Sequence, residues 1–125
     1  MGLSDQMAEL RMRLDSTKDA PRISRQRIAE IKGELGPRFD DVALVISELV
    51  SNSVRHAGNG SLLVSVRSEG AKIRLEVADN GPCFDTDHPR GDGLGLSIVD
   101  KLADSWGIEP EGMCTVWAEL ALPDD

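Results

Sequence analysis

Two neighbouring segments of the 125-residue chain alternate apolar and polar residues, and this alternation constrains the fold more than any other feature. The first segment places Leu62, Val64 and Val66 at every second position, and residues 73–77 repeat the pattern. Successive side chains of a β-strand point to opposite faces, so each segment predicts a strand with one apolar face. Such a face has to be buried against a second layer of structure.

Segments with apolar residues at helical spacing supply the second layer. They predict three helices, over residues 19–36, 40–56 and 94–107, each ended by turn residues such as glycine. Alternating segments at residues 9–16 and 114–122 predict two further strands, which makes four in all. The expected fold class is α/β (α+β), a two-layer sandwich of one sheet with helices on one face.

Length and charge narrow the class of protein. A chain of 125 residues is expected to form a single domain over residues 1–125. Its 14 basic and 22 acidic side chains give a formal net charge of −8, which argues against direct binding of nucleic acid or of an anionic membrane. No segment approaches the roughly 18 apolar residues of a membrane span, and a cytoplasmic protein is expected.

The chain has two cysteines, Cys83 and Cys114, and neither belongs to a CxxC motif or to a histidine cluster. A zinc site is therefore not expected. The sequence leaves open whether the two thiols are reduced or paired.

Polar side chains follow one side of the predicted helix over residues 40–56. Glu48 and Asn52 are four residues apart, so they project from the same side of the helix, one turn apart. A single pair of this kind is commonly part of a solvated helix face. The functional alternative is a general-base carboxylate beside an oxygen ligand for magnesium, which prefers oxygen donors.

Two further segments carry residues that are able to bind a ligand. Asp79 ends a predicted strand and is followed by Asn80 and Gly81, which is typical of a turn but also offers a carboxylate to an amino group. Residues 91–95 read Gly-Asp-Gly-Leu-Gly before a helix, whose free N–H groups can bind phosphate. Their spacing fits neither a dinucleotide-binding fingerprint nor a P-loop.

Together these three elements resemble the GHKL (HATPase_c) ATPase superfamily, which has the Bergerat fold. Within it, the segments SELVSNSVRHA, GLGLSIVDKLADSWGI and CTVWAEL are most similar to stand-alone anti-sigma-factor serine/threonine-protein kinases of the RsbW/SpoIIAB type. The resemblance extends over residues 10–122. It implies an ATP-binding domain with a mixed β-sheet, helices on one face and a lid over the nucleotide.

The resemblance also implies roles for individual residues. Glu48 matches a general-base carboxylate, and Asn52 matches the amide that holds Mg²⁺ between the phosphates of ATP or ADP. Arg55 matches a position that contacts phosphate. Asp79 matches the aspartate that accepts a hydrogen bond from the adenine amino group, and Gly81 matches the glycine beside it.

The remaining implied contacts lie in the loop before the last helix and in the last strand. Residues that match the end of the lid, where the next helix points its N-terminus at phosphate, are Gly91, Gly93, Leu94 and Gly95. Thr115 matches the threonine that completes adenine recognition.

The loop also departs from the family pattern. Cys83 stands where a second glycine is expected, and Asp92 stands between the lid glycines where many relatives carry arginine. Because an acid beside triphosphate is repulsive, Arg90 is expected to supply the missing positive charge. The resemblance implies a lid over residues 82–93.

The implied function is that of an ATP-binding anti-sigma factor. It would phosphorylate an anti-anti-sigma (STAS-type) antagonist on serine and so regulate transcription by partner switching, with the sigma factor and the antagonist as partners. A homodimer is also implied, with the first strand and helix at its interface. Two alternatives stay open: a nucleotide-dependent binding module without phosphoryl transfer, and the ATP-binding partner domain of a two-component histidine kinase.

Overall fold

The computed structural model describes residues 9–57, 60–81 and 96–122, which form one sheet and a layer of helices. The elements in chain order are β1 (Glu9–Asp15), α1 (Ala20–Ile28), a 3₁₀ turn (Ala29–Ile31), α2 (Lys32–Leu35), a second 3₁₀ turn (Gly36–Arg38), α3 (Phe39–Ala57), β2 (Ser61–Glu69), β3 (Lys72–Asp79), α4 (Leu96–Leu102), β4 (Ser105–Glu109) and β5 (Cys114–Ala121).

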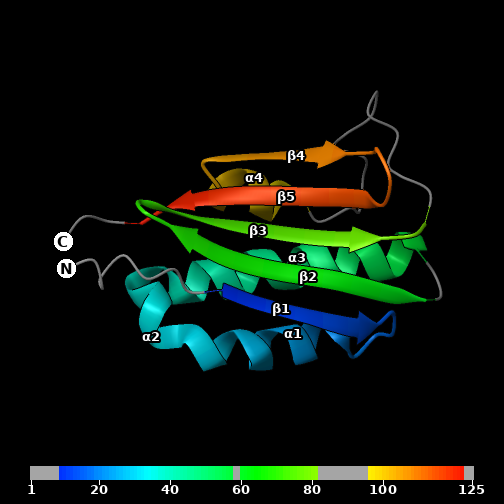
Figure 1. The fold of residues 1–125 in the computed structure, drawn as a ribbon, viewed down its shortest axis with the longest axis horizontal. Coiled ribbons are helices and arrows are strands. Elements are labelled where there is room, and N and C mark those ends of the chain that lie inside the picture. Colours follow the sequence, from blue (N-terminus) through cyan, green and yellow to red (C-terminus); the bar gives the residue numbers. More distant parts are fainter. Residues whose placement is uncertain (1–8, 58–59, 82–95, 123–125) are drawn as a thin grey trace.

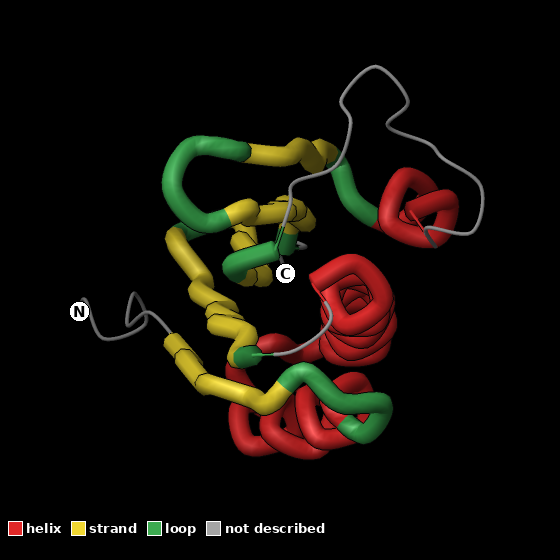
Figure 2. Tube along the Cα trace, turned by 90° about the vertical axis from the view of Figure 1, so that its right-hand side faces the viewer, coloured by secondary structure: helices red, strands yellow, loops and turns green. Residues whose placement is uncertain are grey.

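The sheet has the strand order β1-β2-β3-β5-β4, and the helices lie on one of its faces (Figures 1 and 2). This confirms the predicted two-layer α/β arrangement. The prediction of a mixed sheet is wrong for the described strands, because each of their four pairings is antiparallel. The helical segment between β1 and β2 returns the chain to the end of β1, where the Ser16 N–H donates to the Gly60 carbonyl at 2.8 Å. A strand that starts there can only run back alongside β1.

The alternation predicted for the strands builds the core. Every second residue of β1, β3 and β5 is buried, and these side chains face the helices. Helix α3 lies in the middle of the helical layer, packed on the sheet between α1 and α4 (Figure 2). The largest fully buried side chains come from both layers: Ile28, Leu35, Ile46, Leu49, Leu62, Ile73, Leu75 and Leu120.

The first predicted helix, over residues 19–36, is interrupted after Ile28 by a 3₁₀ turn. Its predicted end is confirmed, because Gly36 has a φ of +56°, a left-handed conformation that favours glycine. The second predicted helix is confirmed as α3, which begins one residue earlier than the expected start at Asp40. Among the described helices, none combines the length and the apolar character needed to cross a membrane.

The prediction of a third helix over residues 94–107 is wrong for its second half. Helix α4 ends at Leu102, and Trp106 and Gly107 lie in β4, a strand that the sequence analysis did not predict. Asp104 redirects the chain, because its N–H donates to the Glu119 carbonyl at 2.8 Å and its carboxylate accepts from the Ala121 N–H at 2.6 Å. These bonds attach residue 104 to β5, so that the next residues continue as an edge strand.

Gly107 is required by the side chain that lies across it. A β-carbon at this position would come within 2.9 Å of the Trp117 ring, and the Arg74 guanidinium lies over the same ring at 4.6 Å from its centroid. We therefore expect Gly107→Ala to lower the free energy of unfolding by about 1–3 kcal/mol, as overpacking does. Urea unfolding measures the change.

Gly33→Ala is the matched control, because a β-carbon on Gly33 meets nothing within 4 Å. It is expected to leave stability unchanged or to raise it by up to about 1 kcal/mol. Equal losses in the two variants would contradict the packing explanation for Gly107.

Candidate functional site

The polar strip predicted on α3 is present in the structure. Glu48, Asn52 and Arg55 follow one another at intervals of four and three residues along the helix. Their burial differs: Glu48 is half-buried, Asn52 is fully buried and Arg55 is exposed. The strip thus runs from the protein interior at Asn52 toward solvent.

Asn52 is the unusual member of the strip. Its side chain is 0% exposed, and neither Oδ1 nor Nδ2 has a hydrogen-bond partner in the part of the chain that the structure describes. An unsatisfied buried polar group costs roughly 1–3 kcal/mol. Buried polar groups are normally satisfied, so an amide with two free ends is the expected state of a ligand-binding residue before the ligand binds.

Glu48 and Arg55 lie on either side of Asn52 in sequence. Glu48 makes no hydrogen bond or ion pair with any described residue, so its carboxylate is available as an acceptor. Arg55 donates from Nη1 to the Ser51 hydroxyl at 3.1 Å, which uses one of the five N–H donors of its guanidinium and leaves the positive charge without an anionic partner among the described residues. The Glu48 carboxylate therefore lies one turn before Asn52 on α3, and the Arg55 cation lies one turn after it.

Asp79 is the last residue of β3, and it is only 4% exposed. Its Oδ1 accepts a hydrogen bond from the Gly81 N–H at 2.8 Å, an Asx turn that fixes the orientation of the carboxylate. Burying a carboxylate is costly unless it is well hydrogen-bonded. Its second oxygen makes no hydrogen bond with a described residue, so it can accept one from a ligand amino group.

The two buried polar residues lie at the same end of the molecule. Helix α3 packs on β3, and the carboxyl ends of both elements lie at the right of Figure 1. Asn52 is in the last two turns of α3, and Asp79 ends β3 on the face that the helices cover. The fold therefore brings Asn52, Asp79 and Gly81 to one end of the helix–sheet interface, and Glu48 lies one turn before Asn52 in the middle of α3.

Thr115 is not part of this group. In β5 the buried, helix-facing residues alternate from Cys114, which leaves Thr115 on the outer face of the sheet. Cys114, not Thr115, is paired with Asp79, and the Thr115 hydroxyl donates to the Met113 carbonyl at 3.2 Å. Neighbouring residues of a strand point to opposite faces of the sheet, so Thr115 points away from Asp79. This argues against Thr115 as a second adenine contact.

Cys114 is the residue that the sequence analysis missed at this position. The apolar alternation of Val116, Ala118 and Leu120 extends back to Cys114 and was a sufficient signal. Cys114 is disulfide-bonded, and the other cysteine of the chain, Cys83, lies outside the described residues.

Several predicted site residues lie outside the described residues: Arg90, Gly91, Gly93, Leu94 and Gly95. The predicted lid over residues 82–93, with Asp92, also lies outside them. The helix expected after this loop is confirmed, and its described part begins at Leu96.

The side-chain oxygen of Asn52 is a donor that fits a magnesium ion. Among the described residues there is no group of three or more histidine, cysteine, aspartate or glutamate side chains that could hold a metal ion. Magnesium is commonly held by one or two protein oxygens together with substrate phosphates and water. The free Oδ1 of Asn52 is an oxygen of that kind.

Comparison with known proteins gives a consistent result. The family model described as histidine kinase-, DNA gyrase B- and HSP90-like ATPase matches residues 39–124. The chain is 27% identical to the serine-protein kinase RsbW of Bacillus velezensis, over 91% of this chain and 86% of that protein. It is 24% identical to the serine-protein kinase RsbW of Staphylococcus aureus, over 86% of this chain and 82% of that protein.

Solved structures agree with this fold. The RsbU and RsbW domains of Rv1364c from Mycobacterium tuberculosis give a TM-score of 0.72 at 26% identity, over 93% of this chain and 33% of that longer one. The Acinetobacter baumannii histidine kinase AdeS gives a TM-score of 0.59 at 16% identity, over 92% of this chain and 68% of that one. The family model covers more than half of the chain, and the chain therefore belongs to the family of histidine kinase-, DNA gyrase B- and HSP90-like ATPases.

Proposed function

We propose that this chain is an ATP-dependent serine-protein kinase that acts as an anti-sigma factor. The observation that carries the proposal is the fully buried Asn52 amide, which lies one turn after the Glu48 carboxylate; neither group has a hydrogen-bond partner among the described residues. Family membership supports nucleotide binding, and relatives at 24–27% identity are named serine-protein kinase RsbW.

In this proposal each described residue has one task. Asn52 binds Mg²⁺ through Oδ1, Asp79 accepts a hydrogen bond from the adenine amino group, and Gly81 allows the base to approach the backbone. Bound ATP supplies the phosphoryl group. Glu48 accepts the proton of the attacking serine hydroxyl, and Arg55 offsets negative charge on the phosphates.

The residues outside the described part of the chain complete the proposed site. Gly91, Gly93, Leu94 and Gly95 would present backbone N–H groups to phosphate at the helix start. Arg90 would supply a second cation.

The proposed partners are a sigma factor and a STAS-type antagonist, in the cytoplasm, with the chain as a homodimer. Phosphorylation of the antagonist on serine would release it and leave the sigma factor bound.

The test is to incubate the protein with magnesium, γ-labelled ATP and the STAS-type proteins of the same genome, and then to map the phosphorylated sites. Label on a serine of one of them is expected. No transfer, together with an ATP-dependent change in partner affinity, would make the protein a nucleotide-dependent binding module instead.

Asp79→Asn tests the proposed adenine contact. The amide keeps the hydrogen bond to Gly81 but presents a donor or a neutral acceptor to the adenine amino group. Loss of a hydrogen bond to a charged group costs roughly 1.5–3 kcal/mol, so ADP should bind about 10- to 100-fold more weakly by calorimetric titration.

Asp104→Asn is the matched control for this change. Asp104 also accepts a backbone N–H, from Ala121, but at the far end of β5 from Asp79. Its ADP affinity should equal that of the wild type. Unchanged affinity in Asp79→Asn would remove Asp79 from the site.

A further inference from the structure

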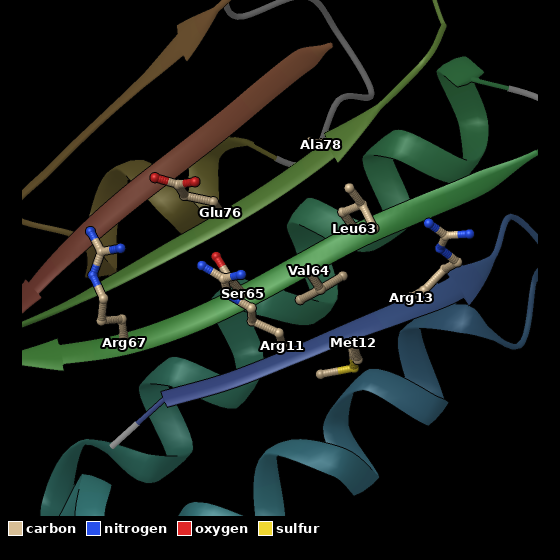
Figure 3. A pocket seen from close by; sticks show the side chains of 9 residues that line it. All are labelled: Arg11, Met12, Arg13, Leu63, Val64, Ser65, Arg67, Glu76 and Ala78. Atoms are coloured by element: carbon tan, nitrogen blue, oxygen red, sulfur yellow. The ribbon is translucent and has the colours of Figure 1, made fainter. Parts of the chain in front are cut away.

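The face of the sheet that the helices leave uncovered carries a hollow of about 410 Å³ (Figure 3). It lies over β1, β2 and β3, on the opposite side of the sheet from the apolar residues that face the helices. Its lining comprises Arg11, Met12, Arg13, Leu63, Val64, Ser65, Arg67, Glu76 and Ala78.

Strand register explains why the surface is hollow here. Ser65 lies between Arg11 of β1 and Glu76 of β3, and Leu63 lies between Arg13 and Ala78. Side chains opposite each other on one face of a sheet are close neighbours. The shorter side chains of Leu63, Ser65 and Ala78 therefore form a floor, and the arginine side chains of β1 form one wall.

The other half of the same face is already filled. Arg74 is ion-paired with Glu76 at 2.7 Å and with Glu119 at 2.9 Å, and Lys72 reaches Glu119 at 3.1 Å. Hydrogen bonds from Arg74 and Lys72 lower the pKa of Glu119 below its usual range. These charges balance one another, so this half offers little to a charged partner.

The charges of the side chains that line the hollow do not cancel in this way. Glu76, the one acid in its lining, is already paired with Arg74. Arg13 is exposed and makes no ion pair with a described residue, and Arg11 has only the exposed Glu9, at 3.1 Å. An exposed pair of this kind is weak and can be exchanged for another carboxylate. An acidic chain of net charge −8 thus carries a locally basic hollow.

Leu63 adds an apolar contact to the basic wall. It is 40% exposed, although it lies in the middle of the hollow beside Ala78. Arg11 and Arg13 are two residues apart on one strand, about 6.5–7 Å along its axis. Alternate side chains of an extended peptide repeat at the same distance.

We propose that this hollow, formed by Arg11, Arg13, Leu63 and Ala78, binds an extended acidic segment of a partner protein. Carboxylates at alternate positions of the segment pair with Arg11 and Arg13, and an apolar side chain of the segment covers Leu63. The surface is on the opposite face of the sheet from Asn52 and Asp79, so it binds independently of nucleotide.

Selection from a phage-displayed library of random peptides tests the proposal. Wild-type protein should enrich sequences with aspartate or glutamate at alternate positions and an apolar residue two positions before or after them, on the same face of the segment. Synthetic copies of the enriched peptides should lose about 10-fold or more in affinity for Arg13→Glu and for Leu63→Ser, with Mg–ADP present or absent. Their affinity for Arg25→Glu, the same charge change on α1, should stay within about twofold of the wild type.

Three results would overturn the proposal. The first is that the enriched peptides have no acidic residues at alternate positions. The second is that Arg25→Glu lowers the peptide affinity as much as Arg13→Glu does, which would indicate unspecific charge attraction. The third is a sedimentation measurement in which wild type is a dimer and Arg13→Glu is a monomer, with no peptide bound by either. That result would assign this face to a second copy of the chain.

Discussion

Asn52→Leu is expected to raise the free energy of unfolding of the nucleotide-free protein by about 1–3 kcal/mol and to abolish magnesium–ATP binding. The gain follows because leucine of similar size removes two buried polar atoms that have no partner among the described residues. The loss follows because leucine has no oxygen for the metal. Urea unfolding and calorimetric titration of the same preparation measure the two effects.

Ser47→Ala is the control for this prediction. Ser47 is also buried on α3, but its hydroxyl donates to the Leu44 carbonyl at 3.0 Å. Removing a satisfied group should bring no comparable gain in stability, and ATP binding should be unchanged. A destabilised Asn52→Leu variant that still binds ATP with wild-type affinity would show that Asn52 is an ordinary structural residue.

Glu48→Gln is expected to reduce phosphoryl transfer to the antagonist by about 10²- to 10⁴-fold, which is the usual contribution of a general base. Glutamine keeps the shape of the side chain but cannot accept the serine proton. ADP affinity should stay within about twofold of the wild type, because Glu48 has no assigned contact with the nucleotide. Single-turnover transfer of labelled phosphate measures the rate.

Glu34→Gln makes the same chemical change on α2, at an exposed position. Its transfer rate should match the wild type. Equal rates in wild type and Glu48→Gln would remove Glu48 as the base and leave the kinase proposal to other residues.

The parts of the fold with strict periodicity could be predicted. Strands β1, β2, β3 and β5 have one apolar face each, and α3 carries a long apolar stripe, so burial alone decides their type and their facing. Gly36 was correctly expected to end a helix because its backbone conformation suits glycine.

Long-range contacts decided the elements that could not be predicted. Strand β4 is a five-residue edge strand that contains Gly107, and Trp106 happens to continue the helical spacing of α4. Its strand conformation comes from pairing with β5, where Trp106 lies opposite Ala118. Strand directions likewise depend on where the helices return the chain, which no local pattern encodes.

The candidate site divides in the same way. Spacing along α3 and the turn after β3 marked Glu48, Asn52, Asp79 and Gly81 as candidates, and only the family resemblance gave them roles. Thr115 was selected from a motif match, whereas the burial alternation of β5 starts at Cys114 and leaves Thr115 on the outer face of the sheet. The complete burial of Asn52 was not predictable, because it depends on the packing of α3 against the sheet and neighbouring helices.

The central claim is that the free amide of Asn52 is a ligand group for magnesium–nucleotide, and one measurement tests it directly. The chain has three asparagines, Asn52, Asn59 and Asn80, so ¹⁵N-asparagine labelling gives three side-chain amide signals, and Asn52→Leu identifies the one from Asn52. Addition of Mg²⁺ and a non-hydrolysable ATP analogue should shift that signal strongly. An Asn52 signal that stays in place at saturating nucleotide, while backbone signals elsewhere report binding, would contradict the claim.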